Sequence, residues 1–184
     1  MAQLNSAKML GGFGTILMLL GGIITFLLPI LGFVLVLIAV KYISDDTKDP
    51  GIFKNYVISF AFGIIALIIA GTVLLAGLFA SIGSVISDNE EMALKSFLGT
   101  IIGALLAFWF FIIISAIFLR KSYISISEKT NVNLFKTTGT VWLIGAILVI
   151  AIIGLAVILI AMVLQMVAFF SLPDKIETQV TFQA

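Results

Sequence analysis

Four long runs without a charged residue determine what this chain can fold into. Ten basic and nine acidic residues divide it into uncharged stretches of 32, 33, 24 and 37 residues, at 9–40, 55–87, 96–119 and 137–173. About 20 apolar residues cross a bilayer as a helix. Helices are required because lipid offers no partners to backbone N–H and C=O groups. With 62% hydrophobic and 10% charged residues, the chain is predicted to be an integral membrane protein.

The number of helices depends on how the first and the last run are divided. As single straight helices they would measure about 48 and 55 Å, more than one crossing needs. Pro29 lies near the middle of the first run, where it kinks or ends a helix, and Gly154 is the candidate break in the last run. We predict an all-α bundle of six transmembrane helices, the first two spanning about 9–27 and 30–44. Four kinked helices or five helices are the alternatives.

Charge distribution predicts the orientation. Seven of the ten basic residues lie in two loops, 41–54 and 120–136, whereas the acidic segment 88–91 has only Lys95 nearby. By the positive-inside rule the basic loops are cytoplasmic, and six helices would place the C-terminus inside as well. The three tyrosines lie at the edges of the basic loops, where an interfacial aromatic belt is expected: Tyr42, Tyr56 and Tyr123.

The two basic loops resemble each other. Both contain a Tyr-Ile-Ser triplet, a Phe-Lys pair and a glycine, at 42–44, 53–54 and 63 in the first and 123–125, 135–136 and 145 in the second. The offset is 81 residues, or 82 after one insertion. Two crossings separate the copies, so they form a parallel repeat. We therefore expect one transmembrane domain, 1–173, with repeat units of about 30–87 and 96–173, and a little-ordered polar tail, 174–184.

Several segments are similar to the domain-of-unknown-function family 996. They are Leu4-Asn5-Ser6-Ala7-Lys8, Lys41-Tyr42-Ile43-Ser44-Asp45, Ile52-Phe53-Lys54-Asn55-Tyr56, Asn133-Leu134-Phe135-Lys136-Thr137 and Ala168-Phe169-Phe170-Ser171-Leu172. The family comprises small archaeal and bacterial membrane proteins with no assigned activity. The resemblance implies a prokaryotic cell membrane and carries over no catalytic or binding residue.

Composition excludes many kinds of chemistry. The chain has no cysteine and no histidine, which removes thiolate and imidazole catalysis and metal ligation. A net charge of +1 gives no basic surface for nucleic acid. The uncharged runs also speak against proton-coupled transport, which uses ionisable residues inside the membrane. We predict no enzyme, no cofactor and no catalytic, cofactor-binding or metal-ligating residue.

Polar residues inside the runs are the remaining candidates for a site. The strongest is Gln165, accompanied by Ser59, Thr72, Thr100, Ser115 and Thr140. Such groups usually form hydrogen bonds between helices, and contact with a substrate is the alternative. Trp109 lies deep in its run, where it either bonds a carbonyl or hydroxyl across helices or lines a cavity.

Two further patterns have competing interpretations. Asp45, Asp46 and Asp49 could hold Mg²⁺ or Ca²⁺, but a solvated loop with an Asp-Pro-Gly turn at 49–51 is favoured. Small residues recur every four positions and serve packing within the chain or contact with another chain: Gly99, Gly103 and Ala107, and Ala76, Ala80 and Ser84.

The leading hypothesis is a non-enzymatic accessory or scaffolding protein that acts through helix contacts. Its partners would be membrane lipids and a membrane protein or further copies of itself. The alternative is a passive channel or carrier for a small uncharged solute or lipid. That alternative requires Gln165, Thr72, Thr100, Thr140 and Ser115 to face one another. A lipid-modifying enzyme that uses the three loop aspartates is the third alternative.

Overall fold

The computed structural model describes residues 2–24, 27–86 and 90–174, and within these ranges the chain forms six α-helices. They are α1 (Ala2–Ile24), α2 (Leu27–Asp46), α3 (Pro50–Ile86), α4 (Glu90–Thr130), α5 (Asn133–Leu148) and α6 (Ile153–Phe170); a 3₁₀ turn, η1 (Val149–Ala151), precedes α6. Five of these helices, α2 to α6, are long and apolar enough to cross a membrane. The prediction of an all-α membrane bundle with six helices is confirmed, and a crossing by α1 stays a prediction.

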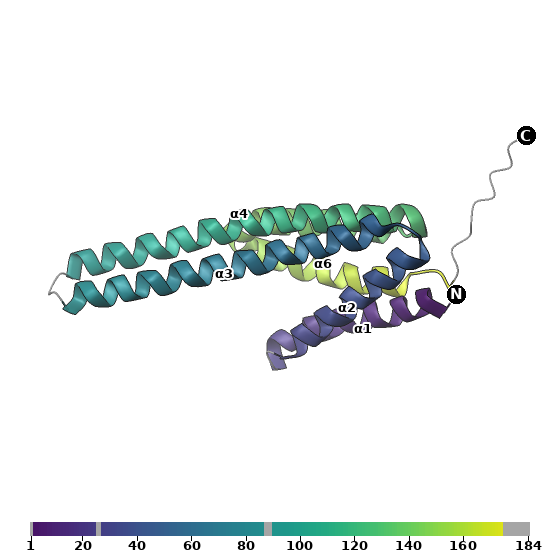
Figure 1. Cartoon of the computed structure of the whole chain (residues 1–184), viewed down its shortest axis with the longest axis horizontal. Helices are drawn as coiled ribbons and strands as arrows, with labels where there is room; N and C mark the ends of the chain where they lie inside the picture. Colours follow the sequence, from purple (N-terminus) through teal and green to yellow (C-terminus); the bar gives the residue numbers. More distant parts are fainter. Residues whose placement is uncertain (1, 25–26, 87–89, 175–184) are drawn as a thin grey trace, which may run out of the picture.

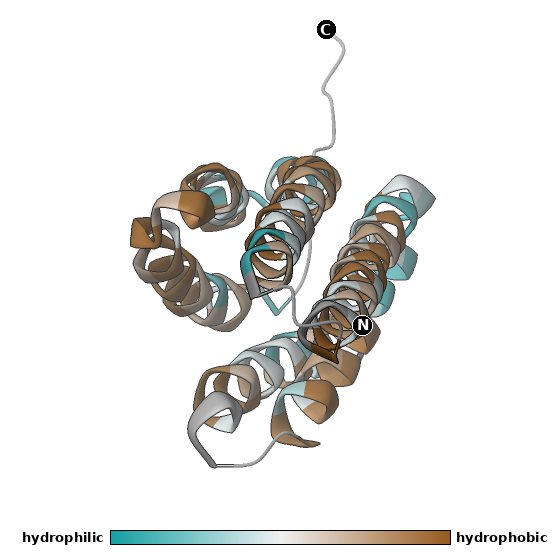
Figure 2. Cartoon of the chain, turned by 90° about the vertical axis from the view of Figure 1, so that its left-hand side faces the viewer, coloured by the Kyte–Doolittle hydropathy of each residue, from teal (hydrophilic) through white to brown (hydrophobic). Residues whose placement is uncertain are grey.

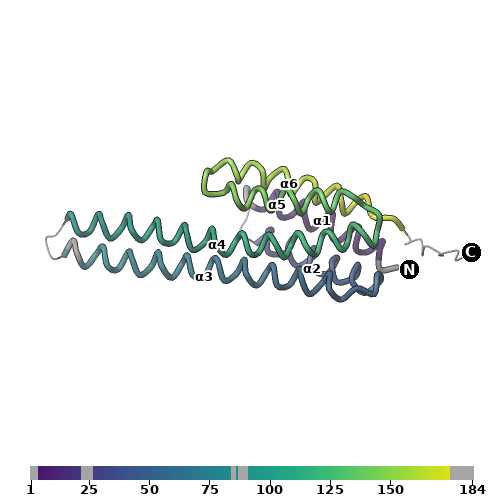
Figure 3. Tube along the Cα trace, turned by 90° about the horizontal axis from the view of Figure 1, so that it is seen from above, coloured from purple at the N-terminus to yellow at the C-terminus, as the bar shows by residue number. Residues whose placement is uncertain are grey.

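The helices form three hairpins that close into a ring. α1 pairs with α2, α3 with α4 and α5 with α6; α2 also contacts α3, α4 contacts α5, and α6 returns to contact α1. The start of α1, the end of α6 and both basic connections lie at one end of the molecule, on the right in Figures 1 and 3. There, Lys8 Nζ lies 3.6 Å from Asp174 Oδ1.

The α3–α4 hairpin is much longer than the other two. Its helices have 37 and 41 residues, which makes them about 55 and 60 Å long. α5 and α6, with 16 and 18 residues, reach only about 24 and 27 Å. Figures 1 and 3 show α3 and α4 continuing past the turns of both short hairpins. Apolar residues predominate on all helices (Figure 2), as expected for surfaces that face lipid.

The most densely buried part of the bundle lies at the end with the basic connections. Tyr123, Phe135 and Phe169 are fully buried there and Tyr56 nearly so. Their rings form a row, with centroids 6.3 Å apart from Tyr56 to Tyr123, then 5.6 Å to Phe135 and 5.1 Å to Phe169. Tyr56 and Tyr123 therefore lie at the basic end as predicted, but they do not contribute to an interfacial belt, because neighbouring helices cover both rings. Tyr42 is half-buried.

The first hairpin begins and turns earlier than expected. α1 starts at Ala2, not near residue 9, because Leu4 and Ala7 are buried in the core and extend the apolar face of the helix. α2 starts at Leu27, so Pro29 lies in its first turn. Proline is tolerated there because the first N–H groups of a helix have no partner within it.

The break in the last run precedes the predicted position. Ile152, with φ 62°, turns the chain between η1 and α6, whereas Gly154 is already inside α6. A side-chain carbon at Gly154 would overlap the backbone of Gly145 and Val149. Glycine is needed at residue 154 for the close approach of α5 and α6, not for the turn.

Both basic connections have the same local geometry. Lys48 and Asn131 have positive φ values, 54° and 58°. The residue before each donates a side-chain hydrogen bond four positions back, from Thr47 to Ile43 O at 2.7 Å and from Thr130 to Ile126 O at 2.7 Å. The residues that match in this turn geometry lie 83 positions apart. The Tyr-Ile-Ser and Phe-Lys matches in the sequence had offsets of 81 and 82, so the two alignments differ by one or two residues. Duplication of the unit stays a prediction.

Candidate functional site: a central uncharged cavity

A cavity of about 160 Å³ lies at the centre of the ring, and all six helices contribute to its wall. The wall is mostly apolar and includes aromatic side chains from three helices: Phe33 on α2, Tyr56 and Phe60 on α3, and Trp142 on α5. None of its described lining residues is charged. The cavity therefore suits an uncharged molecule, because a buried unpaired charge is strongly unfavourable.

One side of the cavity carries a hydrogen-bond network that joins three helices. Trp142 Nε1 donates to Gln165 Oε1 at 3.2 Å, and Gln165 Nε2 donates to Thr15 Oγ1 at 3.1 Å. Thr15 then donates to Gly11 O at 2.8 Å. The indole nitrogen can only donate, so the atom facing it must be the amide oxygen. α1, α5 and α6 are thereby fixed relative to one another.

The other side of the cavity carries a pair of serines. Ser115 Oγ donates to Ser59 O at 2.7 Å, and the two hydroxyl oxygens are 3.2 Å apart. Since a hydroxyl has one proton and that of Ser115 is already used, Ser59 Oγ donates to Ser115 Oγ. The pair joins α3 to α4 and leaves the lone pairs of Ser59 Oγ available as acceptors.

Only part of the predicted polar set meets at this cavity. Gln165, Ser59 and Ser115 line it, whereas the three threonines lie outside its wall. Thr72 donates to Ile68 O, Thr100 to Ser96 O and Thr140 to Lys136 O, each within its own helix. Threonine in a helix commonly satisfies its hydroxyl in this way. The facing arrangement of all five groups that a polar path requires is therefore absent.

Trp109 forms a hydrogen bond across helices. Its Nε1 donates to Ile147 O, in the last turn of α5, at 3.0 Å. The last carbonyls of a helix lack partners within it, and Trp109 satisfies one of them where α5 ends. Between the two interpretations of Trp109, the carbonyl bond is confirmed.

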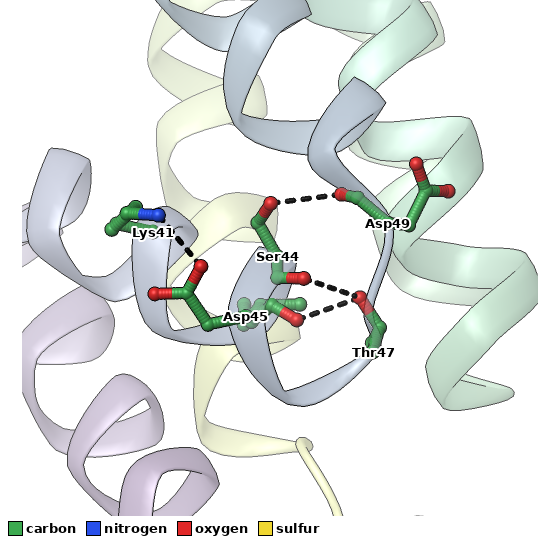
Figure 4. A network of polar contacts seen from close by, with 6 residues as sticks. Lys41, Ser44, Asp45, Thr47 and Asp49 are labelled. Atoms are coloured by element: carbon green, nitrogen blue, oxygen red, sulfur yellow. Dashed lines mark hydrogen bonds and ion pairs between the residues drawn. The ribbon is translucent and has the colours of Figure 1, made fainter.

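The three loop aspartates do not converge on one point. Figure 4 shows that Asp45 pairs with Lys41, at 2.6 Å, and that Asp49 lies across the turn. Asp49 Oδ1 accepts from Gly51 N at 2.9 Å, which caps α3 in front of Pro50. In the described part of the chain, no group of three or more His, Cys, Asp or Glu residues could hold a metal ion.

Four of the small residues predicted to serve packing are exposed on the long hairpin: Ala76, Ala80, Gly99 and Gly103. A side-chain carbon at Gly99 would meet nothing within 4 Å, and one at Gly103 would reach only Val73, at 4.0 Å. Ala76 and Ala80 are exposed, and the side chain of Ser84 lies outside the described part of the chain. The closest α3–α4 approach involves a residue outside both series, Gly77, which packs against Thr100.

Sequence reasoning overlooked two members of the polar network, Thr15 and Trp142. Trp142 precedes Gln165 by 23 residues, across the predicted break of the last run. A hairpin turning at that break would bring the indole donor and the amide acceptor to similar depths. This spacing was the available signal for Trp142, whereas nothing local distinguishes Thr15 from the other threonines.

The apolar helices, the ring of hairpins and the uncharged cavity define a polytopic helical membrane protein. The chain belongs to the family described as "Protein of unknown function (DUF996)", whose family model matches residues 28–163. It is similar to the uncharacterized protein MJ1644 of Methanocaldococcus jannaschii, with 36% identity over 178 residues that cover 96% of this chain and 97% of the relative. No solved structure matches the chain.

Proposed function

We propose that this protein is a non-enzymatic accessory component of a membrane-protein assembly in a prokaryotic cytoplasmic membrane. The observation that supports the proposal is the outer half of the α3–α4 hairpin, meaning the half that lies farthest from the basic connections. No other helix covers it (left in Figure 1). Its surface is apolar, with Phe79, Ile82 and Ile102 all more than half exposed. The partner is an apolar helix of another protein, packed against α4 where Gly99 and Gly103 allow close approach.

Helix length favours a protein partner over lipid alone. The short hairpins match a hydrocarbon layer of about 30 Å, and the uncharged part of α4, 96–119, is only slightly longer, at about 36 Å. The uncharged part of α3, 55–86, is about 48 Å long and exceeds the layer by about 18 Å. Tilting recovers only part of this difference, because transmembrane helices rarely tilt beyond about 40°. Apolar surface at the outer end of the hairpin therefore needs a protein to cover it.

Site-specific crosslinking tests this proposal. A benzophenone amino acid replaces Ile102, which is 57% exposed beside Gly99 and Gly103, or Leu159, which is 56% exposed on α6. Tagged chain is purified from native membranes in mild detergent after illumination. We expect Ile102 to capture one stoichiometric partner protein, Leu159 to capture none, and Gly99→Leu to reduce the yield from Ile102 at least fivefold.

Three crosslinking results would contradict the proposal. Crosslinks from Ile102 only to lipid, only to a second copy of this chain, or unchanged by Gly99→Leu would overturn the accessory proposal.

The central cavity favours a second candidate, a carrier of a small uncharged solute or lipid. A channel is disfavoured because Thr72, Thr100 and Thr140 lie outside the wall of the cavity.

A further inference from the structure

We propose that the central cavity is a binding site for an uncharged, lipid-soluble ring compound that carries a hydroxyl or carbonyl group. The proposal is independent of the accessory role, because it concerns the interior of the ring of helices and not the exposed hairpin. It follows from the size of the cavity, the aromatic part of its wall, its unused hydrogen-bonding groups and its access to lipid.

Size and wall chemistry select a ring. A cavity of about 150 Å³ in an apolar protein core is known to hold benzene, and this one measures about 160 Å³. Aromatic side chains from three helices, among them Phe33, Tyr56 and Trp142, line it. Rings pack favourably against one another in stacked or edge-on geometry, so a flat ligand fits this wall.

The polar groups select a hydroxyl or carbonyl. The Gln165 amide can donate twice and accept twice, and its described bonds use one donor and one acceptor position. Ser59 Oγ retains acceptor lone pairs on the opposite wall. Gln165 and Ser59 are only 3% and 5% exposed, so their remaining capacity is directed at the interior. A hydroxyl can donate to Ser59 and accept from Gln165, and a carbonyl can accept from Gln165.

Access from the membrane is available between α2 and α3. Phe60 lines the cavity and is also 38% exposed, so its ring separates the interior from the lipid-facing surface. Its partner in this wall is Phe33, stacked on it with centroids 4.1 Å apart. A lipid-soluble ligand can therefore enter sideways by displacing one aromatic ring, without passing through an aqueous pore.

The chain provides a matched pair of variants for the test. A side-chain carbon at Gly63 would have only Ser115 Oγ nearby, at 3.7 Å, so Gly63→Leu fills the cavity without a clash at its first carbon. Gly71 lies on the same helix with nothing within 4 Å of its added carbon, so Gly71→Leu points away from any neighbour. Both variants make the same chemical change in α3.

The probe is 4-bromophenol, whose bromine quenches indole fluorescence at short range. The full chain carries Trp109→Phe, which leaves Trp142 as its only tryptophan, and is studied in mild detergent. We expect saturable quenching of Trp142, competition by unbrominated phenol, an affinity at least tenfold weaker in Gly63→Leu, and unchanged affinity in Gly71→Leu. The control is a chain with Trp142→Phe, whose remaining tryptophan, Trp109, does not line the cavity. Quenching of Trp109 measures the 4-bromophenol that is dissolved in the detergent micelle and not bound in the cavity.

A second comparison covers the case in which Gly63→Leu folds poorly. Ser59→Ala should weaken 4-bromophenol binding about fivefold and leave bromobenzene binding unchanged, because only the phenol hydroxyl uses that acceptor. Quenching that rises linearly with concentration, or equal affinity in Gly63→Leu and Gly71→Leu, would overturn the proposal. Equal loss of both probes in Ser59→Ala would overturn the assigned role of the hydroxyl.

Discussion

Some buried polar side chains form hydrogen bonds with neighbouring helices, whereas others, such as Thr130 and Thr138, bond a carbonyl of their own helix. Gln165 bonds Trp142 and Thr15, and Ser122 Oγ donates to Ile52 O at 2.8 Å. Tyr123 is different, because its hydroxyl is the one buried side-chain polar atom in the described part of the chain that has no hydrogen-bond partner. A hydroxyl without a partner in an apolar interior lowers stability by about 1–3 kcal/mol.

Removing that hydroxyl tests its cost. We expect Tyr123→Phe to leave the free energy of unfolding unchanged or to raise it by about 1 kcal/mol, measured by denaturant unfolding in mild detergent. Trp142→Phe is the matched control, because it removes a donor that Gln165 uses, and it should lower stability by about 1 kcal/mol. A clear loss of stability in Tyr123→Phe would reveal a polar partner inside the core.

The importance of Gln165 could be predicted from sequence, but its surroundings could not. An amide in an uncharged run needs hydrogen-bond partners, and this holds whatever the fold. Gln165 bonds Trp142 and Thr15, whereas Thr140 bonds Lys136 O and accepts from Arg120, and this choice of partners depends on how the helices are rotated. Rotation is determined by packing across the ring, which a run of nearly uniform apolar residues does not encode.

At the scale of elements, close helix contacts are made where glycine removes the side chain. α5 and α6 meet at Gly145 and Gly154, and α1 and α2 meet where Gly14 lies against the backbone of Gly32. Close approach of backbones increases van der Waals contact, which stabilises helix pairs in lipid because little hydrophobic driving force acts between them. Glycines that face open space, such as Gly99, contribute nothing to these pairs.

Two alanine substitutions separate these kinds of glycine. Gly154→Ala should lower the free energy of unfolding by about 1–3 kcal/mol, because the added carbon overlaps backbone that cannot move freely. Gly99→Ala should leave stability unchanged or raise it by up to about 1 kcal/mol through helix propensity. Thermal unfolding of both purified variants measures the difference, and equal effects would contradict the assigned close contact.

Helix number followed from sequence because uncharged length and the approximate breaks are physical limits on a chain in lipid. The positions of the turns followed less well. Pro29 predicted the first hairpin but lies inside α2. The turn between α5 and α6 is made by Ile152, with a positive φ, two residues before Gly154. The same residue types serve for turning and for close packing, so composition alone does not separate the two.

At the scale of the whole molecule, the six helices form one ring with both basic connections at the same end. This arrangement fits the positive-inside rule with that end in the cytoplasm, and the orientation stays a prediction. The extra length of α3 and α4 is the feature that most distinguishes the two ends. For α3 this length was present in the sequence as an uninterrupted second run without a proline, whereas α4 is extended by charged segments at both ends of the third run.

Cysteine labelling checks the orientation, because the chain contains no cysteine of its own. Single substitutions are made at the exposed residues Asn5, Lys129 and Glu91. A membrane-impermeant maleimide should label Glu91→Cys on intact cells, whereas Asn5→Cys and Lys129→Cys should react only after permeabilisation. Labelling of Lys129→Cys on intact cells would reverse the orientation, and labelling of Asn5→Cys from the opposite side to Lys129→Cys would contradict the six-crossing fold.

The contact between Lys8 and Asp174 joins the beginning of the ring to its end. Every helix packs against its successor, and the last packs against the first, so the assembled bundle contains no unique starting point. The contacts between helices therefore do not depend on which of the three hairpins is synthesised first. A circular permutant with new termini at the Asp49 turn and a linker between the original termini would keep every pair of neighbouring helices.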